Sequence, residues 1–198
     1  MMNNTQNSIV GEKQEPPTLF QRPDLLLHPN IPKPLHGLAP RTLMKPQRLW
    51  DELRRAAYAK NNYHCWACGA YRNFDLVANK FDDDNGTLDA HEYYVIDYTE
   101  KTTEIKEIVA LCKNCHNYIH SGRQNSIYDK GRLDEEDMWI VNTHGDSVLI
   151  DGGITPIHVI DENLYKEEWN DWRLLFNGKE YKSKWKDYFD WYKHYIIG

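Results

Sequence analysis

The chain has 198 residues, of which 40% are hydrophobic and 13% aromatic, and its formal net charge is −6 at pH 7. This composition excludes wholesale disorder, and the length fits one domain with appendages or two small domains. The negative charge argues against a protein that clamps DNA over a large surface, because phosphate contacts need Lys and Arg, but it does not exclude a nuclease.

The N-terminal part of the chain is predicted to be a polar, proline-rich arm that is partly disordered. Six prolines interrupt the apolar residues between Leu19 and Pro46, so long helices are forbidden and an extended conformation is favoured. Such an arm can lie on its own domain, on a partner protein or on DNA, and the sequence does not choose among these placements. The first five residues lack the basic-then-apolar pattern of a secretion signal, and the chain has no apolar run of about 18 residues. We therefore expect no membrane segment and a cytoplasmic protein.

A helix is predicted next, from Gln47 to Asn61. Apolar residues recur there at helical spacing, and the preceding Pro46 is tolerated at a helix start. The basic residues of this amphipathic helix form either a solvated face or part of a DNA-binding surface.

Two C-x-x-C pairs account for all four cysteines: Cys65 with Cys68, and Cys112 with Cys115. Two such pairs are the signature of a closed tetrahedral Zn²⁺ site, in which four thiolates at ~2.3 Å complete the coordination sphere. A reducing compartment also suits metal-bound thiols better than two disulfides. The sequence therefore predicts a structural zinc ion held by these four cysteines.

A β-hairpin and a short helix are predicted around the second cysteine pair. Residues 88–96 and 104–111 are rich in β-forming residues, so we expect two antiparallel strands. Lys113–His120 follows as a helix, with Gly122 as its stop signal.

The stretch from about Trp50 to Arg123 resembles the zinc-ribbon branch of the HNH endonucleases. The resemblance rests on the first C-x-x-C pair, a strand bearing His91, and a second strand that ends in Leu-Cys-x-x-Cys-His-x-x-x-His. The sequence is similar to a divergent subgroup that phages and mobile elements often encode, which implies a bacterial or phage-infected cytoplasm. The resemblance also implies a ββα-metal core, with a metal held between the hairpin and the helix.

This resemblance implies a division of roles among the histidines. His91 matches the family's general base, which deprotonates water, and His116 matches a ligand of the catalytic cation, Mg²⁺ or Mn²⁺. His120 lies four residues beyond His116 on the same helix face. It therefore either reaches the same ion or phosphate, or orients the ligands.

The chain departs from the family pattern at two positions. Ala90 stands where members carry a metal ligand, and either Asp89 or Glu92 replaces it. Alternatively the register shifts, so that His91 is the ligand and Glu92 is the base. Alternation along a regular strand places Asp89 and His91 on one face, which favours Asp89 unless a bulge intervenes. Glu107 stands where the family has an Asn that helps to hold the hairpin and the base.

The segment after Arg123 lies outside the resemblance, and a second hairpin is predicted there. Short β-like runs occur at 138–141 and 148–160, with turns at 144–146 and 151–153. Acidic residues gather at 82–84 and 134–137, and both runs are predicted to be solvated loops.

Two amphipathic helices are predicted at the C-terminus. Aromatic residues recur at helical spacing in 169–176 and again in 185–196, on either side of Asn177-Gly178. Aromatic residues at this spacing usually pack in a core, which we favour here over stacking on nucleic-acid bases.

The sequence thus predicts an α+β protein in three parts: the arm (1–46), an HNH-like zinc-ribbon nuclease domain (47–125), and a C-terminal extension of hairpin and helices (126–198). The predicted function is that of a metal-dependent DNA endonuclease, which nicks one strand or cuts both. The arm and the C-terminal extension are candidate contacts for a host or phage protein. The alternative is a catalytically inactive zinc-ribbon protein that keeps the fold to bind DNA or a host protein. The residues expected to contact DNA are Arg54, Arg55, Lys60, Lys113 and Arg123.

Overall fold

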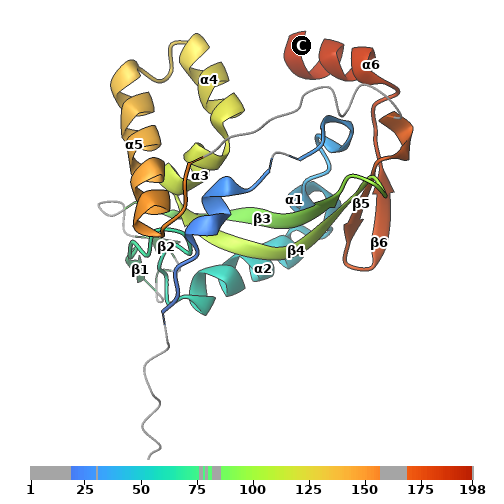
Figure 1. Cartoon of the computed structure of the whole chain (residues 1–198). Coiled ribbons are helices and arrows are strands. Elements are labelled where there is room, and N and C mark those ends of the chain that lie inside the picture. The colour runs from blue at the N-terminus through green and yellow to red at the C-terminus, as the bar shows by residue number, and fades with distance from the viewer. Residues whose placement is uncertain are drawn as a thin grey trace, which may run out of the picture.

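A four-stranded sheet in the order β3-β4-β5-β6 forms the centre of the chain (Figure 1). Strands β3 (Leu88–Asp97) and β4 (Thr102–Cys112) form a long antiparallel hairpin. Strand β5 (Arg173–Phe176) runs parallel to β4, and β6 (Lys179–Lys182) returns antiparallel to β5. A small second sheet pairs β1 (Phe74–Asp75) with β2 (Lys80–Phe81).

The computed structural model describes residues 19–29, 31–75, 78, 80–81, 86–156 and 169–197, and of residues 74, 75 and 123 it describes only the backbone. The predicted α+β class is confirmed. The acidic run at 82–84 and the first 18 residues of the predicted arm lie outside the described residues. Among the described segments, no helix combines the length and the apolar character that a membrane span requires.

Two helices enclose the β3–β4 hairpin from opposite faces, α2 (Gln47–Lys60) and α3 (Lys113–Ile119) (Figure 1). Both helices and the hairpin were predicted, and their bounds agree with the prediction within two residues. The predicted stop at Gly122 is wrong, because helix α4 (Ser121–Asp129) runs through it. His120 separates the two helices instead, since its backbone leaves the helical region (φ −95°, ψ 48°).

The proline-rich segment from residue 19 onwards packs on the protein itself. It forms three short helices, η1 (Pro23–Leu27), η2 (Lys33–Leu35) and α1 (Pro40–Leu43), each with a proline in its first two positions, where the missing N–H costs little. Leu25 and Leu26 are 1% exposed and belong to the main core, which lies around the hairpin and the cysteines.

The predicted hairpin after residue 138 is wrong, because helix α5 (Glu135–Asp151) occupies most of that stretch. The acidic run at 134–137, predicted to be a loop, begins this helix. Asp134 accepts a hydrogen bond from the Asp137 N–H, and the Asp137 carboxylate accepts one from the Asp134 N–H. Such a capping box satisfies N–H groups that have no partner within the helix.

The predicted helix at 169–176 is also wrong. A single 3₁₀ turn (Trp169–Asp171) is followed there by strand β5, and Asn177 (φ 50°) and Gly178 (φ 68°) form a tight turn into β6. Both turn residues have positive φ, as in the type I′ turns that match the twist of paired strands. The second predicted helix is present, but it begins three residues late, as α6 (Tyr188–Tyr192) continued by one π-helical turn to Ile197.

Gly145 in the middle of α5 allows that helix to approach α3 closely. A Cβ atom at Gly145 would lie 2.0 Å from Cδ2 of Tyr118, and the Tyr118 hydroxyl donates to the Asp146 carboxylate at 2.7 Å. The residue predicted to form a turn is therefore a site of helix–helix packing.

Gly145→Ala should destabilise the protein by about 1–3 kcal/mol, because the Tyr118 ring must move to admit the methyl group. Gly122→Ala in α4 is the matched control, since no atom lies within 4 Å of the added Cβ. This control should be neutral or stabilising by up to about 1 kcal/mol. Urea unfolding of both variants measures the difference, and equal stability of Gly145→Ala and wild type would contradict the proposed packing.

Candidate functional site

Four cysteines from two chain segments converge into one cluster. Cys65 and Cys68 lie in the loop after α2, Cys112 ends β4, and Cys115 lies in the first turn of α3. Their sulfur atoms all lie within 4.8 Å of one another, and Cys68 Sγ is 3.8 Å from Cys112 Sγ. Four thiolates at ~2.3 Å from one tetrahedral zinc ion would lie ~3.8 Å apart. The cluster can therefore hold a metal ion such as zinc.

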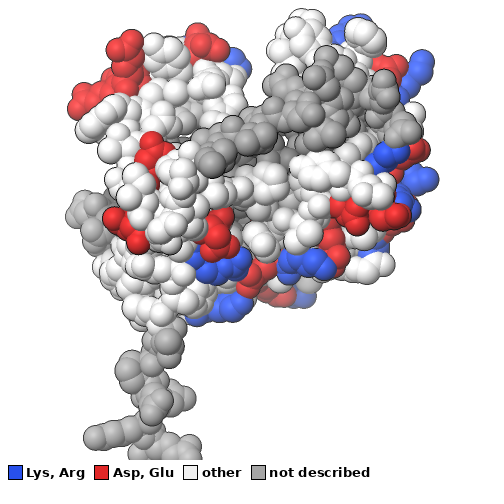
Figure 2. All heavy atoms as spheres, in the orientation of Figure 1, with Lys and Arg blue, Asp and Glu red and all other residues white. Residues whose placement is uncertain are grey.

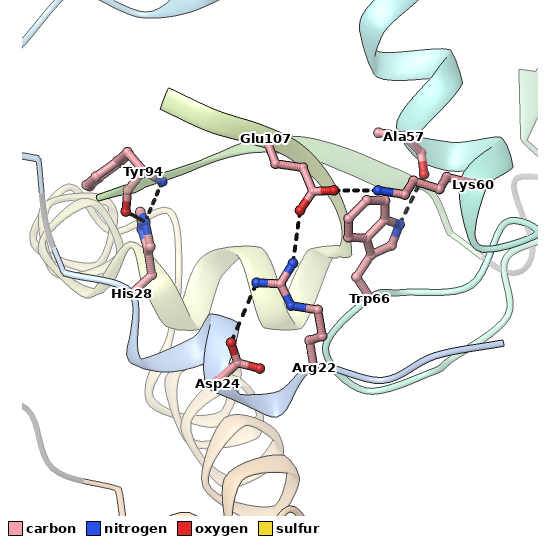
Figure 3. Close-up of polar contacts among 8 residues, drawn as sticks. All are labelled: Arg22, Asp24, His28, Ala57, Lys60, Trp66, Tyr94 and Glu107. Carbon is pink, nitrogen blue, oxygen red and sulfur yellow. Dashed lines mark hydrogen bonds and ion pairs between the residues drawn. The ribbon is translucent and has the colours of Figure 1, made fainter. Parts of the chain in front are cut away.

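Trp66 fixes the first cysteine loop against the hairpin and α2. Its side chain is 1% exposed, its indole N–H donates to the Ala57 carbonyl at 3.0 Å (Figure 3), and its backbone N–H donates to Ala110 of β4 at 2.8 Å. Gly69 then turns the loop with φ +74°, a conformation that favours glycine. These contacts bring the loop cysteines to the end of β4.

His144 of α5 contacts the cysteine cluster, and the sequence did not predict this contact. Its Nε2 lies 3.3 Å from Cys115 Sγ and 3.9 Å from Cys112 Sγ. Hydrogen bonding to the thiolates of Cys112 and Cys68 raises the pKa of His144 to about 10. The imidazole therefore offers an N–H to sulfur and offsets part of the negative charge of the thiolates.

Three histidines form a second cluster, between the hairpin and α3. His91 lies on β3, His116 lies in α3, and His120 directly follows the last residue of α3. One ring nitrogen from each lies within 4.8 Å of the others. The cluster can therefore hold a metal ion through nitrogen ligands.

His91 is the buried member of this cluster. It is 4% exposed, and neither ring nitrogen has a hydrogen-bond partner. Burial, together with the nearby His120 and His116, lowers the pKa of His91 well below its ordinary value. The imidazole is therefore neutral at physiological pH, with a lone pair for a proton or a metal ion.

Asp89 forms a hydrogen bond with a member of the histidine cluster, whereas Glu92 interacts with His116 through its charge. The Asp89 carboxylate lies 3.0 Å from Nδ1 of His116. Strand register is regular from Leu88 to Tyr93, because the bulge comes one residue later, so Glu92 lies on the face opposite Asp89 and His91. Burial raises the pKa of Glu92. Of the carboxylates considered from the sequence, the structure places Asp89 at the site.

His28 of the N-terminal segment packs against the histidine cluster, and the sequence did not predict this contact either. Its Nε2 accepts a hydrogen bond from the Tyr94 N–H at 3.0 Å (Figure 3), and its ring meets the His91 ring edge-on with centroids 5.5 Å apart. Burial lowers the pKa of His28 to about 4. A neutral, anchored imidazole therefore covers His91.

The basic residues expected to contact DNA differ in their availability. Arg54 pairs with Asp51 at 2.7 Å, and Lys60 pairs with Glu107 at 2.5 Å. Arg55 and Lys113 are exposed, and the side chain of Arg123 lies outside the described residues. On the face drawn in Figure 2, basic and acidic side chains are interspersed.

Glu107, which the sequence comparison placed at a predicted Asn position, connects three segments of the chain. Its carboxylate pairs with Arg22 of the N-terminal segment at 2.9 Å and with Lys60 of α2 (Figure 3). Arg22 also lies over the Tyr93 ring at 4.9 Å. Glu107 thus holds the hairpin by ion pairs to its flanking segments.

No family model matches this chain, and no match was found among curated proteins or among solved structures. The functional argument therefore depends on the two clusters and their surroundings.

Replacing His144 should weaken metal retention by the cysteine cluster. His144→Ala removes an N–H donor to the sulfur atoms, and losing such a partner of a metal ligand typically costs about 10–100-fold in affinity. Thr143→Ala, an exposed neighbour on the same helix, is the control. Zinc release to a competing chelator measures the effect, and identical release from His144→Ala and wild type would show that the contact is incidental.

Proposed function

We propose that this chain is a metal-dependent DNA endonuclease of the HNH type, built around a structural zinc ion. The observation that carries the proposal is the convergence of His91, His116 and His120 between a β-hairpin and the following helix, beside four clustered cysteines. This arrangement supports the roles that the sequence resemblance implies. Phosphodiester hydrolysis needs charge neutralisation at the phosphate and activation of water, and the histidine cluster can serve both needs.

The histidine cluster is organised for this chemistry by its own hydrogen bonds and burial. Asp89 accepts the Nδ1–H of His116, which orients the His116 ring and leaves Nε2 as its lone-pair nitrogen. A divalent cation bound there would neutralise charge on the scissile phosphate and the leaving oxygen. The neutral His91 offers its lone pair either to a proton of the attacking water or to the cation.

The cysteine cluster has a separate, structural role in this proposal. Cys65, Cys112 and Cys115 are at most 1% exposed, and four sulfur ligands leave no open position for substrate. A zinc ion here would join the loop after α2 to the β4–α3 junction, and thereby fix the helix that carries His116 and ends just before His120.

Purified protein should contain one tightly bound zinc equivalent, and Cys112→Ser should lose it and unfold under conditions where wild type is folded. Structural zinc contributes ~10 kcal/mol or more in small modules. Elemental analysis and circular dichroism measure both effects. Ser147→Ala, an exposed position of α5, is the control. Normal folding of Cys112→Ser without zinc would contradict the structural role.

Wild-type protein should convert supercoiled plasmid to nicked or linear DNA when a divalent cation is added, and mild chelation should stop cleavage without unfolding the protein. His116→Ala should need a higher cation concentration for half-maximal cleavage, because one nitrogen ligand is lost. His194→Ala is the control, since that imidazole is half exposed and pairs with Asp190 in the C-terminal helix. Cleavage rate against cation concentration is the measurement.

Two outcomes of this assay would count against the proposal. Plasmid binding without cleavage in any cation would favour the alternative, a zinc-ribbon protein that binds DNA without cutting it. Simultaneous loss of fold and activity at every chelator concentration would show that the two metal sites are not separate.

A further inference from the structure

We propose that this chain forms a two-fold dimer, in which the C-terminal helix of each copy docks on the outer side of α5 of the other copy. Two exposed apolar surfaces make the contact. The α6 face consists of Phe189, Tyr192, Ile196 and Ile197, and the α5 face consists of Trp139, Ile140 and Ile150. The dimer does not depend on the proposed nuclease function.

The α6 face is apolar although it lies on the surface. Phe189 is 80% exposed, and Tyr192 and Ile196 are exposed as well. These three residues are spaced three and four apart, so they share one side of the helix. The other side is anchored, because Trp191 is buried and its indole N–H donates to Nδ1 of His36 at 3.2 Å. The helix is therefore held by one side and presents the other side to a partner.

The α5 face is a second exposed apolar strip. Trp139 is 66% exposed and Ile150 is 63% exposed. At about 100° per residue, the step from Trp139 to Ile150 makes about three full turns, so both side chains point in nearly the same direction. The other side of α5 holds Gly145 against Tyr118. Aligned and exposed apolar side chains on a helix mark an interaction surface.

Charge identifies a second copy as the partner of both faces. Five acidic residues and no Lys or Arg occur in α5: Glu135, Glu136, Asp137, Asp146 and Asp151. Four exposed lysines lie on or beside the C-terminal helix: Lys182, Lys184, Lys186 and Lys193. The two aspartates of this segment are used locally, since Asp187 caps α6 and Asp190 pairs with His194.

Other occupants fit these charges less well. Nucleic acid would match the lysines beside the α6 face but would be repelled by the carboxylates of α5. Pairing of α5 with α5, or of α6 with α6, would bring like charges together. A second copy of the chain offers an acidic surface to the α6 face and a basic surface to the α5 face, so one partner covers both.

One chain does not make this contact with itself, because the two faces lie at opposite ends of the sheet (Figure 1). Helix α5 packs on α3, which follows the last residue of β4. Helix α6 packs near Trp169, which precedes β5, and β5 pairs with the first residues of β4. In a two-fold dimer each copy supplies both faces, so the contact forms twice.

Analytical ultracentrifugation of the full zinc-loaded chain tests the dimer. Wild type should sediment as two chains at high protein concentration and dissociate on dilution, and high salt should weaken the dimer by screening the charges. Phe189→Ala and Trp139→Ala should each raise the dimer dissociation constant about tenfold or more, as truncation of central aromatic residues does. Val95→Ala, an exposed apolar residue of β3 outside both faces, is the control.

Exchanging the charges tests which face meets which. The double variants Glu135→Lys/Glu136→Lys and Lys186→Glu/Lys193→Glu should each stay monomeric alone, because each places like charges across both contacts. An equimolar mixture of the two should form a heterodimer, since opposite charges then meet in both contacts. Circular dichroism checks that each variant keeps its fold, and the wild-type mass decides on its own if a variant unfolds.

Three outcomes would overturn the proposal. The first is a wild-type monomer at every concentration. The second is a dimer that Phe189→Ala weakens and Trp139→Ala leaves unchanged, because α6 would then pair with α6. The third is a monomer that binds single-stranded DNA and loses this binding in Phe189→Ala, because the α6 face would then be a nucleic-acid contact.

Discussion

Helix α3 and the residues on either side of it supply side chains to two clusters at once, and this constraint determines much of the surrounding structure. Cys112 and Cys115 lie three residues apart and meet the loop cysteines, while His116 and His120 lie four residues apart and meet β3. Cys115 and His116 are successive residues of α3, and successive helical residues point about 100° apart, so this thiol and this imidazole emerge on different sides of the helix. An isolated helix of seven residues is unstable in water, so α3 depends on these contacts and on the core around it.

The residues that complete the two clusters come from outside segment 47–125, which was predicted to form the HNH-like domain. His28 covers His91 from the N-terminal side of the chain, and His144 contacts the cysteines from α5. The proline-rich segment and α5 thus belong to the immediate surroundings of both clusters. The division of the chain into three domains stays a prediction, although the central sheet takes strands from two of the predicted parts.

Local patterns predicted α2, the long hairpin and α3, because their periodicity and cysteine spacing agree with the final structure. The C-terminal third was mispredicted where local signals conflicted. Val148 and its β-branched neighbours favour a strand, but the Asp134–Asp137 capping box starts a helix that runs through them. Asn177-Gly178 fits a break between helices as well as a hairpin turn, and the structure has the hairpin turn. His28 and His144 belong to no short motif, so only the tertiary fold brings them to the clusters.

The central claim is that α3 binds one metal ion on its thiol side and a different one on its imidazole side. Anomalous X-ray scattering from crystals of the full chain, grown with zinc and then soaked in Co²⁺, tests it most directly. The account predicts a zinc peak among the sulfurs of Cys65, Cys68, Cys112 and Cys115, and a cobalt peak in the histidine cluster that contacts the ring of His116. A cobalt peak absent from the histidines would contradict it.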